Sequence, residues 1–135
     1  GGAWTRVQRL NRFEEHSHSL NYSGSWKTLA NADSSGGGVN YSGVAGSTVS
    51  FDFTGNRVRW MATNGPNQGK AEVYVDGVFT SMVDMYSATR KFLLPVFDTG
   101  GLAPGQHSIM VRVSGSKNQA SSGSFVTLDA FEVED

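Results

Sequence analysis

The chain has 135 residues, among them 17 glycines and no cysteine, and its formal net charge is −1. This length suits one domain with a sizeable core, and the glycine content argues against a helical protein. The charge gives no electrostatic basis for binding nucleic acid or an anionic membrane. A chain without cysteine has no thiolate nucleophile, thiolate zinc site or cysteine-ligated iron–sulfur cluster.

The first part of the chain gives few structural signals. No signal-peptide pattern opens it, and the start "GGAWTRV" leads us to expect a fragment of a longer protein. We interpret residues 1–19 as a linker or an added strand packed on the module, and residues 20–135 as the module itself. The glycine-rich segment 31–46 predicts a loop with at most a short strand around Tyr41. No apolar run reaches the roughly 20 residues of a membrane span, so we expect none.

From Thr48 onward, apolar and polar residues alternate with a period of two, which is typical of half-buried strands. Val58 and Trp60 share one predicted face, and His107 shares a face with Ile109, so we expect Trp60 and His107 to point into the core. Asp76-Gly77 separates two alternating runs and predicts a hairpin turn. The alternating segments are 47–53, 57–62, 70–75, 78–84 and 106–113.

Two later segments depart from simple alternation. The segment 91–98 is apolar on both faces, and its Pro95 predicts an edge position or a bulge. In 125–133 the apolar pattern changes parity, which predicts a β-bulge near Asp129 and Ala130. Eight or more short strands separated by turns favour an all-β fold, a jelly-roll β-sandwich of two antiparallel sheets.

The sequence offers no convincing catalytic pattern. No two carboxylates form an evident pair, as a glycosidase needs, and there is no G-x-S-x-G motif. His16 and His18 can share one strand face, but no third ligand for a transition metal is indicated. We therefore expect that the chain is not an enzyme.

Calcium is the metal that the sequence suits better, because loops of a β-sandwich supply carboxylate and carbonyl oxygens. First and last strands commonly lie together in such folds. Glu14 and Glu15 near the first strand and Asp129 near the last are therefore candidate ligands for a structural Ca²⁺. The alternative is that Glu14 and Glu15 are solvated while Asp129 binds backbone groups at the bulge.

Three loops concentrate amide and cationic side chains, which are good partners for sugar hydroxyls. They are 62–70, 84–91 and 114–124, and Trp26 is a candidate ring for stacking on a sugar face. The alternative is that these polar groups only solvate turns. The candidate carbohydrate-binding residues are Trp26, Asn67, Gln68, Lys70, Tyr86, Arg90, Lys117 and Asn118.

Several short stretches also carry a resemblance to a known family. They are "YSGSW", "VRW", "GPN", "GK", "VDG", "YSA" and "KNQASSG", spread between about Leu20 and Glu134. On these stretches the chain resembles bacterial extracellular β-sandwich modules, similar to galactose-binding-like domains and to carbohydrate-binding modules of secreted glycoside hydrolases and surface proteins. Related modules often carry an acidic run before "YSGSW", whereas this chain reads "FEEHSHSLNYSGSW".

The resemblance implies a secreted or cell-surface protein in which the module binds a poly- or oligosaccharide without cleaving it. The module would hold a parent catalytic or surface domain of the same chain on that glycan. The alternative is a structural or protein-interaction module of a cell-surface protein with no sugar site.

Overall fold

The computed structural model describes residues 10–30 and 38–135, which form twelve β-strands and no helix. Expectations for residues 1–9 and 31–37 lie outside the described residues. Among the described residues, no helix is long and apolar enough to cross a membrane. The strands are β1 Leu10–Glu14, β2 Leu20–Ser23, β3 Lys27–Ala30, β4 Gly38–Ser42, β5 Thr48–Gly55, β6 Arg57–Asn64, β7 Lys70–Val75, β8 Val78–Asp84, β9 Lys91–Asp98, β10 Gly105–Val113, β11 Val126–Leu128 and β12 Ala130–Glu134.

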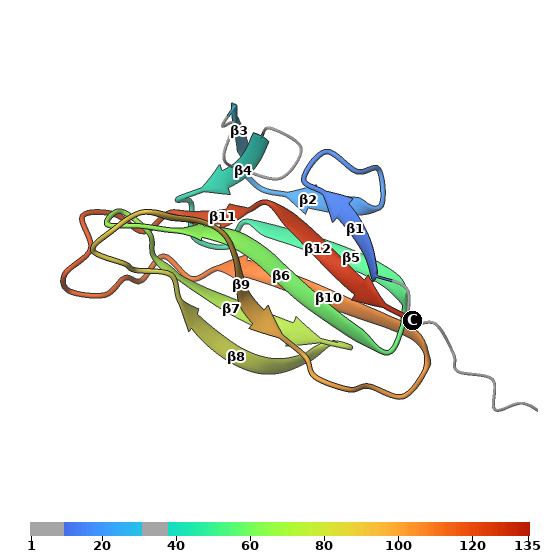
Figure 1. Cartoon of the computed structure of the whole chain (residues 1–135). Helices are drawn as coiled ribbons and strands as arrows, with labels where there is room; N and C mark the ends of the chain where they lie inside the picture. The colour runs from blue at the N-terminus through green and yellow to red at the C-terminus, as the bar shows by residue number, and fades with distance from the viewer. Residues whose placement is uncertain (1–9, 31–37) are drawn as a thin grey trace, which may run out of the picture.

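The strands form an antiparallel β-sandwich, which confirms the predicted all-β class (Figure 1). One sheet has the order β1-β12-β6-β9 and the other has the order β2-β5-β10-β7-β8. A third sheet, β11-β4-β3, was not predicted, and its strands β3 and β4 lie at the top of the view in Figure 1. The short strand expected around Tyr41 is β4, the middle strand of this sheet.

The core lies between the two larger sheets. Alternation places Phe51 of β5 inward, and its ring stacks on Phe131 of β12 with centroids 5.2 Å apart. Trp60 is fully buried, as predicted, and its indole N–H donates to the carbonyl of Thr127 at 3.2 Å. Burying such rings stabilises the fold by about 1.5–3 kcal/mol each relative to exposure.

Local signals in the sequence explain several turns and edges. Asp76 and Gly77 have φ values of 50° and 78°, the left-handed conformation that a tight two-residue hairpin requires between β7 and β8. β9 is an edge strand, as Pro95 predicted, and its pairing with β6 shifts register between Trp60 and Met61. Proline has no backbone N–H, so on an edge strand it does not remove a hydrogen bond from the interior of the sheet.

The parity change near the C-terminus marks a strand that passes from one sheet to another. β11 pairs with β4, whereas β12 pairs with β6 and β1, and Asp129 lies between them. The backbone N–H of Asp129 donates to the carbonyl of Met61 at 3.0 Å. The predicted irregularity is therefore at the expected residue, and it moves the side chains of β12 into the core between the larger sheets.

His107 does not lie inside the core, contrary to the expectation from its parity. Its ring packs on Phe53, but its side chain is 14% exposed because it stands near the start of β10, at the rim of the sandwich. Alternation identifies the inward face of a strand but not where along the strand the core ends.

Candidate functional site

The three loops predicted to carry a binding site meet at one end of the sandwich (Figure 1). Arg90 Nη2 donates to Asn67 Oδ1 at 3.0 Å, which joins the loop 84–91 to the loop 62–70. Asn118 Nδ2 donates to Asp84 Oδ2 at 3.0 Å, which joins the loop 114–124 to the start of 84–91. Residues more than 20 positions apart thus form one connected edge, here called the loop edge.

Backbone contacts hold this edge tightly. Gly69 N–H donates to the Phe125 carbonyl at 2.7 Å, and a Cβ on Gly69 would lie 2.6 Å from the backbone of Ser124. Only glycine permits that approach. The buried hydroxyl of Ser121 donates to the Gln68 carbonyl at 2.7 Å. The loops are therefore joined by main-chain and buried side-chain hydrogen bonds.

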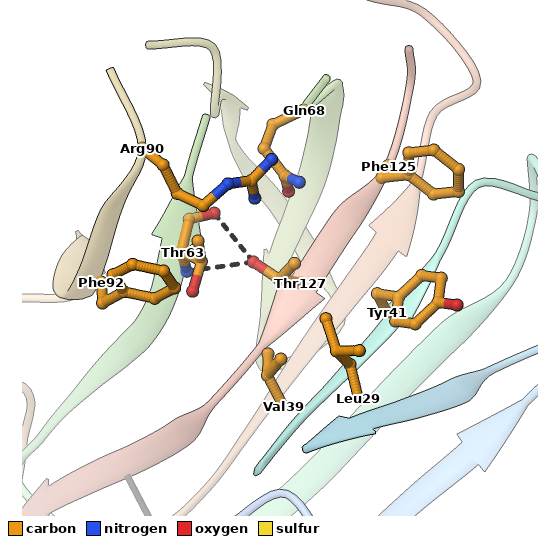
Figure 2. A pocket seen from close by; sticks show the side chains of 9 residues that line it. All are labelled: Leu29, Val39, Tyr41, Thr63, Gln68, Arg90, Phe92, Phe125 and Thr127. Atoms are coloured by element: carbon orange, nitrogen blue, oxygen red, sulfur yellow. Dashed lines mark hydrogen bonds between the residues drawn. The ribbon is translucent and has the colours of Figure 1, made fainter. Parts of the chain in front are cut away.

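A hollow of about 80 Å³ lies between the loop edge and the small β11-β4-β3 sheet (Figure 2). By the volume that an enclosed water needs, it has room for a few water molecules. Its lining residues are Leu29, Val39, Tyr41, Thr63, Gln68, Arg90, Phe92, Phe125 and Thr127.

Two buried polar groups in this lining have unused hydrogen-bonding capacity. Gln68 and Thr63 are each 2% exposed, and neither Gln68 Oε1 nor Thr63 Oγ1 has a partner among the described residues. Leaving such a buried group unpaired costs about 1–3 kcal/mol. Gln68 Nε2 is held by Asn67 Oδ1 at 3.1 Å, so the amide is oriented. Gln68 Oε1 can accept from one ligand hydroxyl, and the Thr63 hydroxyl can donate to or accept from another.

Aromatic side chains supply the apolar part of the hollow. Tyr41 of β4 and Phe125 before β11 form an edge-to-face pair with centroids 5.7 Å apart. Phe92 of β9 lines the opposite side, next to Arg90 (Figure 2). Partly exposed rings beside polar groups suit a ligand with both C–H faces and hydroxyls, as sugars have.

The predicted site residues divide into those that line the hollow and those that build its rim. Gln68 and Arg90 line it. Asn67 holds both of them, and Asn118 binds Asp84. Lys117 Nζ donates to the Ser121 carbonyl at 2.8 Å. Lys70, Tyr86, Lys117 and Asn118 belong to the same edge but are not among the lining residues.

Trp26, which was predicted as a stacking ring, does not line this hollow. Its indole N–H donates to the carbonyls of Ser23 and Thr48 at 3.1 and 3.0 Å. Its ring packs edge-to-face on Tyr22, against the core. Two backbone acceptors and a ring partner fix Trp26 as a structural side chain between β2 and β5.

Sequence reasoning missed Thr63, Tyr41, Phe92 and Phe125. Tyr41 and Phe125 lie next to glycine- or serine-rich segments, and Phe92 follows the loop 84–91. That signal is weak because rings at strand ends usually pack in the core. Their convergence depends on β4 pairing with β11, which no local pattern predicts.

The predicted metal ligands lie together at a second place. Glu14, Glu15 and Asp129 each offer a carboxylate oxygen, and these oxygens all lie within 4.8 Å of one another. Glu14 ends β1, and its Cα partner is Ala130, so strand pairing brings it beside Asp129. Glu15 and Asp129 are 3% and 0% exposed, so this carboxylate cluster is largely screened from water.

The surroundings of Glu15 fit a hard cation. The main-chain carbonyl of Glu15 accepts from Tyr22 Oη at 2.7 Å and from Asn40 Nδ2 at 3.3 Å, which fixes the residue. Its buried Oε2 has no hydrogen-bond partner among the described residues. The donor set is entirely carboxylate oxygen, which is the chemistry of calcium rather than zinc. Arg12, bound to Glu132 through Nε at 3.0 Å, lies within electrostatic range of Glu14 and Asp129.

A third polar group lies at the opposite rim. His107 Nε2 is 2.6 Å from the Ala103 carbonyl, and Nδ1 is 2.7 Å from Asp76 Oδ2. Both partners are acceptors, so the geometry requires both ring nitrogens to carry protons. The Ala103 carbonyl and then Asp76 raise the pKa of His107, while the hydrogen bond from His107 lowers the pKa of Asp76. This group ties the β7–β8 turn to the β9–β10 loop.

Comparisons with known proteins agree with a module of a larger protein. No family model matches the chain. It is 36% identical over 98 residues to an A type blood N-acetyl-alpha-D-galactosamine deacetylase of Flavonifractor plautii. The aligned region covers 73% of this chain and 13% of that protein. The chain is 34% identical over 92 residues to an A type blood alpha-D-galactosamine galactosaminidase of the same organism, covering 68% of this chain and 8% of that protein.

Solved structures show the same fold at low sequence identity. A Paenibacillus xanthan lyase matches with a TM-score of 0.67 and 19% identity, over 91% of this chain and 13% of its own. The CBM36-1 domain of a multidomain xylanase from the hindgut metagenome of Trinervitermes trinervoides matches with a TM-score of 0.61 and 11% identity, over 92% of this chain and 95% of its own. The chain is thus a β-sandwich module similar in sequence and fold to parts of carbohydrate-active proteins.

Proposed function

We propose that the chain is a non-catalytic carbohydrate-binding module whose sugar site is the hollow between the loop edge and β4. The observation that carries this proposal is a pair of buried residues, Gln68 and Thr63, that line the same hollow as Tyr41, Phe125 and Arg90. Each has a side-chain oxygen with no hydrogen-bond partner among the described residues. In the proposed complex one sugar ring lies against the aromatic side chains, its hydroxyls donate to the two oxygens, and Arg90 donates to a sugar oxygen.

The parent protein is proposed to be a secreted or cell-surface protein that the module holds on its glycan. The chain spans 13% and 8% of the two Flavonifractor plautii enzymes that it matches, which supports a role as one part of a multidomain chain. The fold is proposed to be a galactose-binding-like jelly roll, with Glu14, Glu15 and Asp129 holding a structural calcium ion. That ion would balance two of the three carboxylate charges, two of which lie on buried residues, and would link the end of β1 to the β11–β12 junction.

Binding of sugars tests the proposal, first on a glycan array and then by isothermal calorimetry with the best oligosaccharide. We expect modest affinity, micromolar to millimolar, or about 4–8 kcal/mol. Tyr41→Ala and Arg90→Ala are expected to weaken binding about tenfold or more, since each removes a group lining the hollow. Their melting temperatures are expected to stay near that of the parent because both side chains are at least partly exposed.

Asn118→Ala is the matched comparison, because Asn118 belongs to the loop edge but does not line the hollow. It should change affinity less than Tyr41→Ala does. If Asn118→Ala lowers the affinity for the sugar as much as Tyr41→Ala does, or more, the sugar binds at the rim rather than in the hollow. Absence of any glycan binding would instead favour a structural or protein-interaction module. Sugar products released by the isolated chain would reveal an enzyme.

A further inference from the structure

The charged side chains of this protein are distributed unevenly. Among the described residues, four arginines form ion pairs on the sheet surfaces: Arg12, Arg57, Arg59 and Arg112. The remaining described cations are Lys27, Lys70, Arg90, Lys91 and Lys117, and none of these has an ion pair. Four of those five belong to the loops 62–70, 84–91 and 114–124, where Asp84 is the one carboxylate. The loop edge is therefore positive on a chain of net charge −1.

A second hollow continues the proposed sugar site. It measures about 390 Å³ and shares Tyr41 and Phe125 with the first hollow, so this edge-to-face pair forms a ridge between the two. Lys27, Ser25 and Ser124 are among the residues that line its far side. A ligand that passes over the Tyr41–Phe125 ridge would therefore contact both hollows.

Each hollow carries one cation and no carboxylate in its lining. Arg90 lines the first hollow and Lys27 lines the second. Asn67 occupies Nη2 of Arg90, and the rest of that guanidinium keeps its donors for a ligand. The side chains of Asp84 and Asn118 are already joined to each other, so the neighbouring carboxylate is used within the loops.

We infer that the two hollows together bind an acidic oligosaccharide of at least two sugar units, whose carboxylate or sulfate groups meet both Arg90 and Lys27. This inference rests on the proposed function, because it names the class of glycan that the same site takes. An anionic ligand gives Arg90 and Lys27 a negative partner, as the sheet arginines already have in their carboxylates. A charge-assisted hydrogen bond is about twice as strong as a neutral one. A positive edge also raises the association rate of an anionic polymer.

Affinity electrophoresis and a glycan array give the first test. The array carries neutral glycans beside their uronate-, sialate- and sulfate-bearing counterparts, and the gels contain polygalacturonate, chondroitin sulfate, neutral galactan or xylan. We expect the bound set to be acidic, with affinity falling severalfold as salt rises from about 0.05 to 0.5 M because exposed charges are screened. The best acidic glycan should bind more tightly as a trisaccharide than as a monosaccharide.

Charge variants then locate the effect. Arg90→Gln is expected to weaken binding of that acidic glycan about tenfold or more, and Lys27→Gln by about threefold, as for an exposed ion pair. Lys91→Gln removes the same charge from the same edge but lines neither hollow, so it should have the smaller effect. Circular dichroism melts of all three variants establish that each is folded.

The outcomes separate this inference from the proposed function. Equal binding of neutral and acidic glycans, without salt dependence, would overturn the inference and leave sugar binding intact. Equal effects of Lys27→Gln and Lys91→Gln would also overturn it, because the attraction would then be diffuse rather than located in the second hollow. Failure to bind any glycan would remove the proposed function and this inference with it.

Discussion

Removing calcium is expected to lower the melting temperature of this protein by about 8–13 °C. The proposed ion binds Glu14, Glu15 and Asp129, whose oxygens lie within 4.8 Å of one another. Without a cation, two ionised carboxylates at that distance repel by about 3.5 kcal/mol at an effective dielectric constant of 20, opposed in part by Arg12. A divalent ion replaces that repulsion with attraction, so it should bind the folded state selectively.

The size of the shift follows from mass action. At a calcium concentration one hundred times Kd, binding to the native state alone adds about 2.7 kcal/mol to the free energy of unfolding. For a domain of 135 residues, each kcal/mol moves the melting temperature by about 3–5 °C. The product is the shift stated above.

Differential scanning calorimetry measures this shift in excess calcium and again in excess EGTA. Asp129→Asn should remove at least half of it, whereas Asp52→Asn should leave it unchanged, because Asp52 is exposed on β5 away from the cluster. Superimposable melting curves with calcium and with EGTA would refute the reasoning. The cluster would then be a group of carboxylates balanced by Arg12 and its other neighbours.

Three further predictions concern the fold. Trp60→Phe should lower the free energy of unfolding, measured by urea titration, by about 2–3 kcal/mol. The shorter side chain leaves a cavity and removes the N–H that the buried Thr127 carbonyl accepts. A change below about 0.5 kcal/mol would contradict the packing described. Gly77→Ala should cost about 1 kcal/mol from its positive φ alone, since no atom lies within 4 Å of the added Cβ; a neutral result would indicate a different turn. The His107–Asp76 pair should stabilise the protein between about pH 4 and pH 6.5. Because folding raises the pKa of His107, its contribution to the free energy of unfolding is complete below its unfolded pKa and is lost as pH rises through its folded pKa. Because folding lowers the pKa of Asp76, its contribution to the free energy of unfolding is lost as pH falls through its folded pKa. His107→Gln should flatten the fall in melting temperature between pH 6 and pH 9, and an unchanged profile would assign that fall to other groups.

The comparison of sequence with structure shows where local patterns are informative. Alternation identified the inward residues of β5, β6, β7 and β10, because strand geometry sends successive side chains to opposite faces whatever the partner strand is. The same rule failed for His107, since it contains no information about where the opposite sheet ends. The position of Trp26 outside the hollow was not evident for a related reason: two backbone carbonyls accept its N–H, and neither follows from the residues around it.

The all-β class, the Asp76–Gly77 hairpin and the irregularity at Asp129 could be predicted from the sequence. For Pro95 the sequence predicted an edge position or a bulge, and the structure places it on the edge strand β9. Each depends on backbone conformations within a few residues, which composition and spacing constrain directly. That Tyr41 and Phe125 meet beside Gln68 and Arg90 could be seen only in the folded chain. The fold also pairs Arg90 with Asn67, Asn118 with Asp84, and Lys117 with the Ser121 carbonyl. These contacts join segments that are far apart in the chain: Tyr41 and Phe125 are separated by 84 positions and meet because β4 pairs with β11. No local propensity encodes such a pairing.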